Sequence, residues 1–126
     1  DPSTSDELEE LSDELSETGD GAWETALIVA SLVVLAPLGE ELLFRGILLR
    51  TLVRRMAFAP AAIATSAAFA LVHLDQYVPY PLWPRTLGLA VTGLILAWIY
   101  RARGYWAAVS AHATVNGIAA IALLTT

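Results

Sequence analysis

The chain has 126 residues, enough for one domain and too few for two of ordinary size. Its formal net charge is −6, it contains no lysine, and nine of its thirteen acidic residues lie in residues 1–20. A mean hydropathy of +0.59 is too high for a typical soluble domain and excludes a disordered chain. The chain has no basic face, which excludes nucleic acid as a partner, and no cysteine, which excludes disulfides and thiolate zinc sites.

Residues 1–20 form the acidic N-terminal segment. Leucines recur there at helical spacing, at Leu8, Leu11 and Leu15, so the segment is either a linker or a short amphipathic helix. Acidic runs usually serve to solvate a chain, which favours the linker. No basic region precedes the first apolar stretch, so no cleavable signal peptide is predicted. We expect the chain to be part of a longer membrane protein.

Four stretches of residues 22–126 lack charged residues for long enough to approach the width of a bilayer. They are Thr25–Gly39, Met56–Leu74, Thr86–Tyr100 and Gly104–Thr126. A bilayer core requires roughly 20 helical residues, and the second and fourth stretches supply them. The first continues through a short charged stretch into further apolar residues, and the third is long enough if its ends lie in the interface. The sequence therefore predicts an all-α, multi-pass membrane domain with four transmembrane helices.

Aromatic and basic residues support this topology. All eight tyrosines and tryptophans fall at the ends of the four stretches or between them, as is typical of membrane interfaces. Five of the seven arginines lie in the first and third connections: Arg50, Arg54, Arg55, Arg101 and Arg103. The positive-inside rule places these two connections in the cytoplasm and both ends of the chain outside. The protein is thus expected to be integral to a membrane, with membrane lipids as partners.

Few polar side chains interrupt the apolar stretches. They are Glu40, Glu41, Arg45, His73, His112 and Asn116. Ionisable groups inside membrane segments are costly, so each is by default a candidate functional residue. Glu41 and Arg45 are four residues apart on one helix face, which predicts an ion pair and leaves Glu40 free for chemistry.

The depth of these residues gives an independent indication. At about 1.5 Å of rise per residue, Glu40, His73, His112 and Asn116 lie roughly 15, 20, 12 and 18 Å from the cytoplasmic ends of their helices. A single histidine or asparagine in an apolar helix is often only a packing residue or an interhelical hydrogen-bond partner. Their common level instead predicts one polar cavity lined by Glu40, His73 and His112, with Asn116 at its edge.

Three motifs resemble those of a known family. Glu40-Glu41-Leu42-Leu43-Phe44-Arg45 is similar to an EExxFR motif, Phe69-Ala70-Leu71-Val72-His73 to FxxxH, and His112-Ala113-Thr114-Val115-Asn116 to HxxxN. In this order and on separate helices, the motifs resemble those of the CPBP intramembrane proteases, also called the Abi or CAAX type II prenyl endopeptidase family. The resemblance covers about residues 22–126.

The resemblance implies an endopeptidase that is embedded in a membrane. We expect this membrane to be the plasma membrane of a prokaryote. The substrate would be a membrane-associated or lipidated protein or peptide, with prenylated proteins among those known for the family. By resemblance, Glu40 and His73 would activate the attacking water, and His112 with Asn116 would stabilise the oxyanion. Glu41 belongs to the same catalytic set. The supporting residues are Arg45, Phe44 and Phe69.

The same residues leave the cofactor open. Glu40, His73 and His112 make a plausible three-ligand zinc site, which we slightly favour, and they equally allow a metal-free general base. Two other functions also stay open. A non-catalytic binding or immunity protein of this fold would tolerate Glu40→Gln. A fragment of an ion or proton transporter would not need Asn116 one turn from His112.

Overall fold

The computed structural model describes residues 21–74 and 82–125, and in this part of the chain every regular element is a helix. The acidic segment 1–20 and residues 75–81, which connect the second and third apolar stretches, lie outside it. A first continuous helix runs through Gly21–Leu52. It contains η1 (Ser31–Leu35), α2 (Ala36–Glu41), η2 (Leu42–Leu49) and α3 (Arg50–Leu52), and it is followed by α4 (Phe58–Val72), α5 (Leu82–Arg103) and α6 (Tyr105–Thr125). The all-α prediction is confirmed.

The first helix passes through a proline without ending. A π-helical turn precedes Pro37, and its last bond runs from the Ala36 N–H to the Ser31 carbonyl. The next bond in this register would need an N–H on Pro37, which proline lacks. Asn116 of α6 supplies the missing donor, because its side-chain amide lies 2.8 Å from the Leu32 carbonyl oxygen. The freed carbonyl is thus satisfied by a neighbouring helix, as membrane helices with internal prolines require.

Helices α4 and α5 pack closely through small residues. Alanines of both helices form a buried cluster with Leu49 of η2, and Ser66 lies directly opposite Gly93. A Cβ placed on Gly93 would lie only 3.0 Å from the Cβ of Ser66. Small residues at such crossings let helix backbones approach each other, which is how helices associate in membranes.

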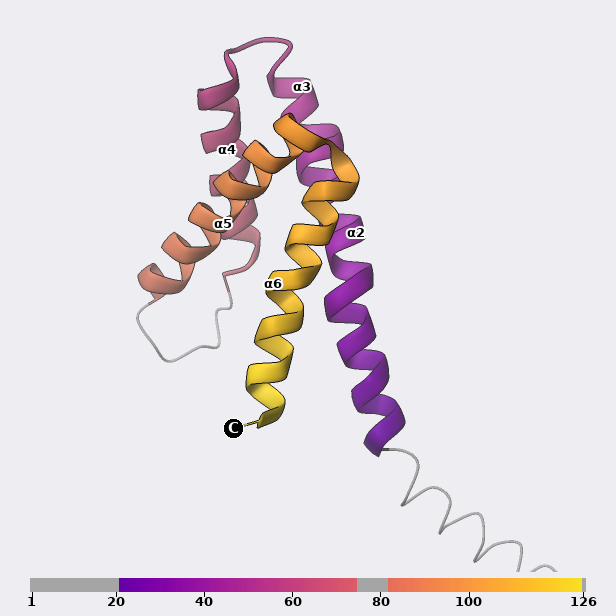
Figure 1. Ribbon diagram of the computed structural model, residues 1–126. Helices are drawn as coiled ribbons and strands as arrows, with labels where there is room; N and C mark the ends of the chain where they lie inside the picture. The colour runs from indigo at the N-terminus through magenta and orange to yellow at the C-terminus, as the bar shows by residue number, and fades with distance from the viewer. Residues whose placement is uncertain (1–20, 75–81, 126) are drawn as a thin grey trace, which may run out of the picture.

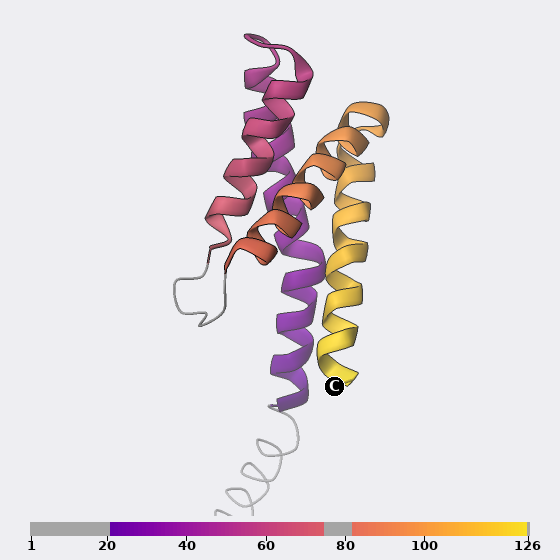
Figure 2. The ribbon, with the colours of Figure 1, turned by 90° about the vertical axis from the view of Figure 1, so that its left-hand side faces the viewer.

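The fourth helix returns along the first. Gly104 has a positive φ of 86°, which glycine adopts without strain, and it separates α5 from α6. Helix α6 then lies beside the Gly21–Leu52 helix in both views (Figures 1 and 2). The hydroxyl of Tyr105 donates to the Leu38 carbonyl at 2.8 Å and ties the start of α6 to α2. Helix α6 therefore lies beside α2, which carries the two glutamates.

The membrane spans are only partly as predicted. Among the described residues, Gly21–Leu52 and Tyr105–Thr125 are long and apolar enough to cross a bilayer. Helix α4 is apolar but has 15 residues, and α5 has 22 residues but is less apolar than the two long helices. The four predicted helices are present in order, and the crossing of the bilayer by α4 and α5 stays a prediction.

Candidate active site

The candidate site lies where α2, α6 and the end of α4 meet. Glu40 and Glu41 are the last residues of α2, His73 follows α4 directly, and His112 lies in the middle of α6. The Nε2 atom of His73 lies 3.5 Å from Oε1 of Glu40, and that of His112 lies 3.5 Å from Oε2 of Glu40. Residues that are more than 70 positions apart in the sequence thus converge on one carboxylate.

Glu41 and Arg45 form the predicted ion pair, and both are buried. Arg45 Nη1 lies 2.9 Å from Glu41 Oε1, and the two side chains are 1% and 0% exposed. Arg45 Nη2 donates to the Gly93 carbonyl of α5, also at 2.9 Å. The guanidinium carbon lies 4.9 Å from the centre of the Phe69 ring, close enough for a cation–π contact. Arg45 thus joins three helices behind the site.

His112 is held by the paired glutamate. Its Nδ1 lies 2.8 Å from Oε1 of Glu41. An ionised carboxylate only accepts hydrogen bonds, so Nδ1 carries the hydrogen and donates it. In the neutral ring, the lone pair is then on Nε2, which faces Glu40. Glu41 therefore fixes both the orientation and the tautomer of His112.

His73 is fixed in the same way by its own helix. Its Nδ1 lies 2.6 Å from the Phe69 carbonyl oxygen, and a carbonyl only accepts, so Nδ1 is again the donor. The Nε2 lone pair of the neutral ring then faces Glu40. The spacing of FxxxH explains this contact, because the last carbonyls of a helix lack backbone donors and Phe69 lies four residues before His73.

Glu40 differs from Glu41 in its surroundings. Its side chain is 27% exposed, and its Oε2 accepts no hydrogen bond from the described residues although that atom is buried. With neutral histidines, the carboxylate and both Nε2 atoms are all acceptors, so they cannot bond to one another directly. A donor placed among them would satisfy this cluster, and a water molecule is such a donor.

The two predicted phenylalanines form an aromatic wall beside the imidazoles. Phe44 and Phe69 pack edge to face with ring centres 5.2 Å apart. Phe69 also contacts His73 at 4.5 Å and His112 at 5.7 Å between ring centres. Phe44 and Phe69 are 5% and 1% exposed, so this wall is rigid and dry. Phe69 thus packs against both imidazole rings, and Phe44 packs against Phe69.

Asn116 lies one turn beyond His112, and its contact with Leu32 places its amide on the first helix. Within the described part of the chain, Asn116 forms no hydrogen bond with Glu40 or with His73. The amide nitrogen carries two hydrogens, and the Leu32 carbonyl accepts one of them. A role for Asn116 at an oxyanion stays a prediction.

The residues do not fit a resident metal as they are arranged. The ligand types suit zinc, because both Nε2 atoms carry lone pairs and Glu40 is a carboxylate. Within residues 21–74 and 82–125, however, no three histidine or acidic side chains are placed so that they could hold one ion. The two imidazoles instead face different oxygens of Glu40. Zinc stays a prediction of the sequence.

Two residues at the site were missed by the sequence analysis. Gly93 accepts the hydrogen bond of Arg45, and Ser66 packs against it with a buried Oγ that has no partner among the described residues. Gly93 lies in the third apolar stretch, and small residues there indicate a close helix crossing in a membrane. Spacing along one helix could not indicate which carbonyl Arg45 would reach.

The comparisons with known proteins agree with the motifs. The chain matches the sequence model of the family described as type II CAAX prenyl endopeptidase Rce1-like over residues 22–118, about three quarters of its length. No curated protein and no solved structure shows significant similarity to the chain. The match includes Glu40, Glu41, His73, His112 and Asn116. The protein is integral to the membrane, as are the proteases of this family, and the chain belongs to the Rce1-like type II CAAX prenyl endopeptidases.

Proposed function

We propose that the protein hydrolyses a peptide bond of a membrane-associated or lipidated protein, with water activated by Glu40 and His73. One observation carries this proposal: the Nε2 atoms of His73 and His112 both face the carboxylate of Glu40 at 3.5 Å. A water molecule placed among these acceptors donates both of its hydrogens to them. Its oxygen lone pairs are then directed away from the cluster, towards a substrate carbonyl.

The reaction would proceed by general base and general acid steps. Glu40 takes a proton from the water as the water oxygen attacks the carbonyl carbon, and a tetrahedral intermediate forms. The carbon–nitrogen bond then breaks as Glu40 returns the proton to the leaving amine. His73 keeps the water in position, because its own orientation is fixed by the Phe69 carbonyl.

His112 would stabilise the intermediate. Its Nδ1–H donates to the carboxylate of Glu41, which keeps the ring in a fixed orientation. Once Nε2 has taken up a proton from solvent, it can donate this hydrogen to the oxyanion. Glu41 thus acts on the substrate only through His112, and Arg45 keeps this glutamate in position. Donors of this kind at an oxyanion typically contribute about 10²–10³ in rate.

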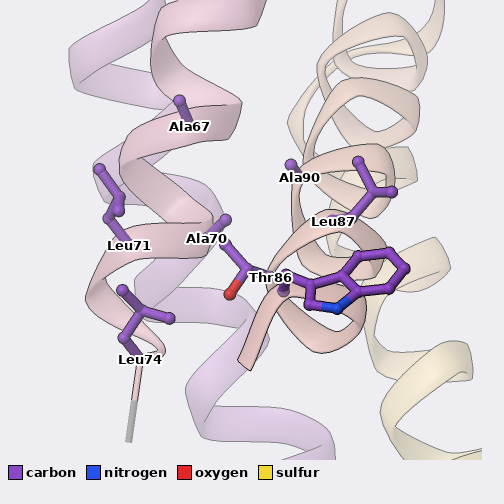
Figure 3. Close-up of a pocket in the computed structure, with 8 residues that line it drawn as sticks. Ala67, Ala70, Leu71, Leu74, Thr86, Leu87 and Ala90 are labelled. Atoms are coloured by element: carbon purple, nitrogen blue, oxygen red, sulfur yellow. The ribbon is translucent and has the colours of Figure 1, made fainter. Parts of the chain in front are cut away.

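An apolar groove beside the site supports a substrate with an apolar segment. The groove lies between α4 and α5 and has a volume of about 640 Å³, within the usual range of ligand sites. Figure 3 shows Ala70 and Leu71 of α4, with Leu74 just beyond the end of that helix, on one side and Leu87 and Ala90 of α5 on the other. The groove begins next to His73 in the sequence, because the following residue, Leu74, lines it. We propose that a prenyl group or an apolar peptide segment lies here during cleavage.

The experiment uses the full-length protein in liposomes with a farnesylated CAAX peptide as probe. Mass spectrometry is expected to detect release of the three C-terminal residues. Ala67→Phe, which fills the groove, should raise KM with little change in kcat, whereas Ala64→Phe on an exposed position of the same helix should change neither. Binding of the peptide without any cleavage would contradict the proposed hydrolysis. Equal effects of Ala67→Phe and Ala64→Phe would contradict the role of the groove.

A further inference from the structure

Five arginines gather at one end of the helix bundle. The turn that follows α3 and the junction of α5 with α6 lie at the same end in both views (Figures 1 and 2). The arginines at these positions are all exposed: Arg50, Arg54, Arg55, Arg101 and Arg103. Within residues 21–74 and 82–125, none of them has an ion pair. This end of the protein therefore carries five positive charges without a bound counter-charge.

Two of these arginines line one pocket. Arg50 of α3 and Arg101 of α5 face a cavity of about 120 Å³. The remaining lining residues are Leu49, Val53, Phe58 and Tyr100. The surface of the pocket is apolar, so the two arginines line it with their aliphatic stems, and their guanidinium groups contribute no surface to it.

Arg101 is held in place by aromatic rings. Its guanidinium carbon lies 4.4 Å from the centre of the Phe58 ring and 5.7 Å from that of Trp98. Such cation–π contacts use the face of the guanidinium and leave its in-plane N–H donors available. These donors have no hydrogen-bond partner among the described residues, and a guanidinium with free in-plane donors is suited to bind phosphate oxygens in a bidentate manner.

We propose that Arg50 and Arg101 bind the phosphate of an anionic phospholipid, and that the apolar pocket between their stems takes the adjoining apolar part of the lipid. The apolar pocket favours a lipid over a free phosphate ion, because Val53 is 41% exposed beside the pocket and the surfaces of the first helix continue apolar towards Ile47, which is 54% exposed. Acyl chains can lie along these surfaces while the phosphate contacts both guanidinium groups. Basic pockets between helices at the cytoplasmic ends of membrane segments bind anionic head groups on the same physical basis.

The test compares two double variants that remove the same charge from the same end. Arg50→Gln with Arg101→Gln alters the pocket, and Arg54→Gln with Arg103→Gln alters only its surroundings. Each full-length protein is purified in detergent and titrated with phosphatidylglycerol or phosphatidylcholine, and bound lipid is measured by native mass spectrometry. Thermal unfolding in phosphatidylcholine checks that every variant is folded.

The pocket variant should bind phosphatidylglycerol about tenfold more weakly, since it loses two charge-assisted contacts, with phosphatidylcholine binding unchanged. The surrounding variant should lose much less. Equal losses in the two variants would overturn the proposal in favour of diffuse attraction, and displacement of the lipid by inorganic phosphate alone would show a free-phosphate site instead. Phe58→Leu, which keeps the pocket apolar but removes the ring under Arg101, should also weaken phosphatidylglycerol binding.

Discussion

Glu41 holds His112 through the same oxygen atom that Arg45 contacts. Glu41 Oε1 lies 2.8 Å from Nδ1 of His112 and 2.9 Å from Nη1 of Arg45. One buried carboxylate therefore links a fixed positive charge on its own helix to an imidazole on α6. Oε1 of Glu41 is engaged in this way and the whole side chain is buried, whereas Glu40 is partly exposed, so we propose Glu40 as the acid for proton transfer.

Arg45→Ala should destabilise the protein as well as inactivate it. The substitution leaves Glu41 as an unpaired buried charge and the Gly93 carbonyl without its donor, and breaking a buried pair typically costs about 3–5 kcal/mol. Thermal unfolding in detergent measures the change. Arg85→Ala, at an exposed position of α5, is the matched control and should have little effect. An unchanged unfolding temperature for Arg45→Ala would show that the pair is not structurally important.

Gly93→Ala should lower kcat by about tenfold, because a misplacement of about 1 Å can cost about 10²-fold in rate and the shift here is smaller. The new methyl group would contact Ser66 at 3.0 Å, so α5 must move and carry the carbonyl away from Arg45. Gly88→Ala on the same helix is the control, since a Cβ at Gly88 would have no atom of a neighbouring helix within 4 Å. Steady-state kinetics on the farnesylated peptide distinguish the two variants. Equal rates would argue against any role of Gly93 in positioning Arg45.

Asn116→Ala should have two effects. If the second amide hydrogen serves the oxyanion, kcat falls by about 10²–10³ with little change in KM. Stability should also fall, because the Leu32 carbonyl loses its donor, at a typical cost of about 1–3 kcal/mol. Thr114→Ala on an exposed part of α6 serves as the control for both measurements. Loss of stability with an unchanged kcat would confine Asn116 to the contact with Leu32.

Metal content separates the zinc prediction from the general-base proposal. With water activated by Glu40 and His73, the purified protein should keep its activity after treatment with a chelator and dialysis. Elemental analysis of the same sample measures bound zinc. A stoichiometric metal whose removal abolishes cleavage, and whose return restores it, would contradict the proposal and establish the zinc site that the sequence predicts.

Contacts along a single helix could be predicted from the sequence. The Glu41–Arg45 pair follows from their spacing of four residues, and the spacing of Phe69 and His73 places the imidazole over a carbonyl at the helix end. The common depth of Glu40, His73 and His112 also indicated one cavity, because rise per residue is nearly constant in helices. These features depend only on local geometry.

Contacts between helices could not be predicted in the same way. Which glutamate contacts Nδ1 of His112 and which contacts Nε2 depends on how α2 is rotated against α6, and the π-helical turns before and after α2 change that rotation. The contact of Asn116 with Leu32 depends on the bond that Pro37 cannot make, so it requires the register of the π turn. The hydrogen bond from Arg45 to the Gly93 carbonyl depends on the close crossing of α4 and α5.

The most direct test of the proposed mechanism is the turnover of Glu40→Gln in the full-length protein. Glutamine keeps the shape of the side chain but cannot take the proton of the water. Cleavage of the farnesylated peptide should fall to background while thermal unfolding and membrane insertion stay as in the native protein, and Glu24→Gln, exposed on the same helix, should keep full activity. Near-native cleavage by Glu40→Gln would contradict the assignment of Glu40 as the general base.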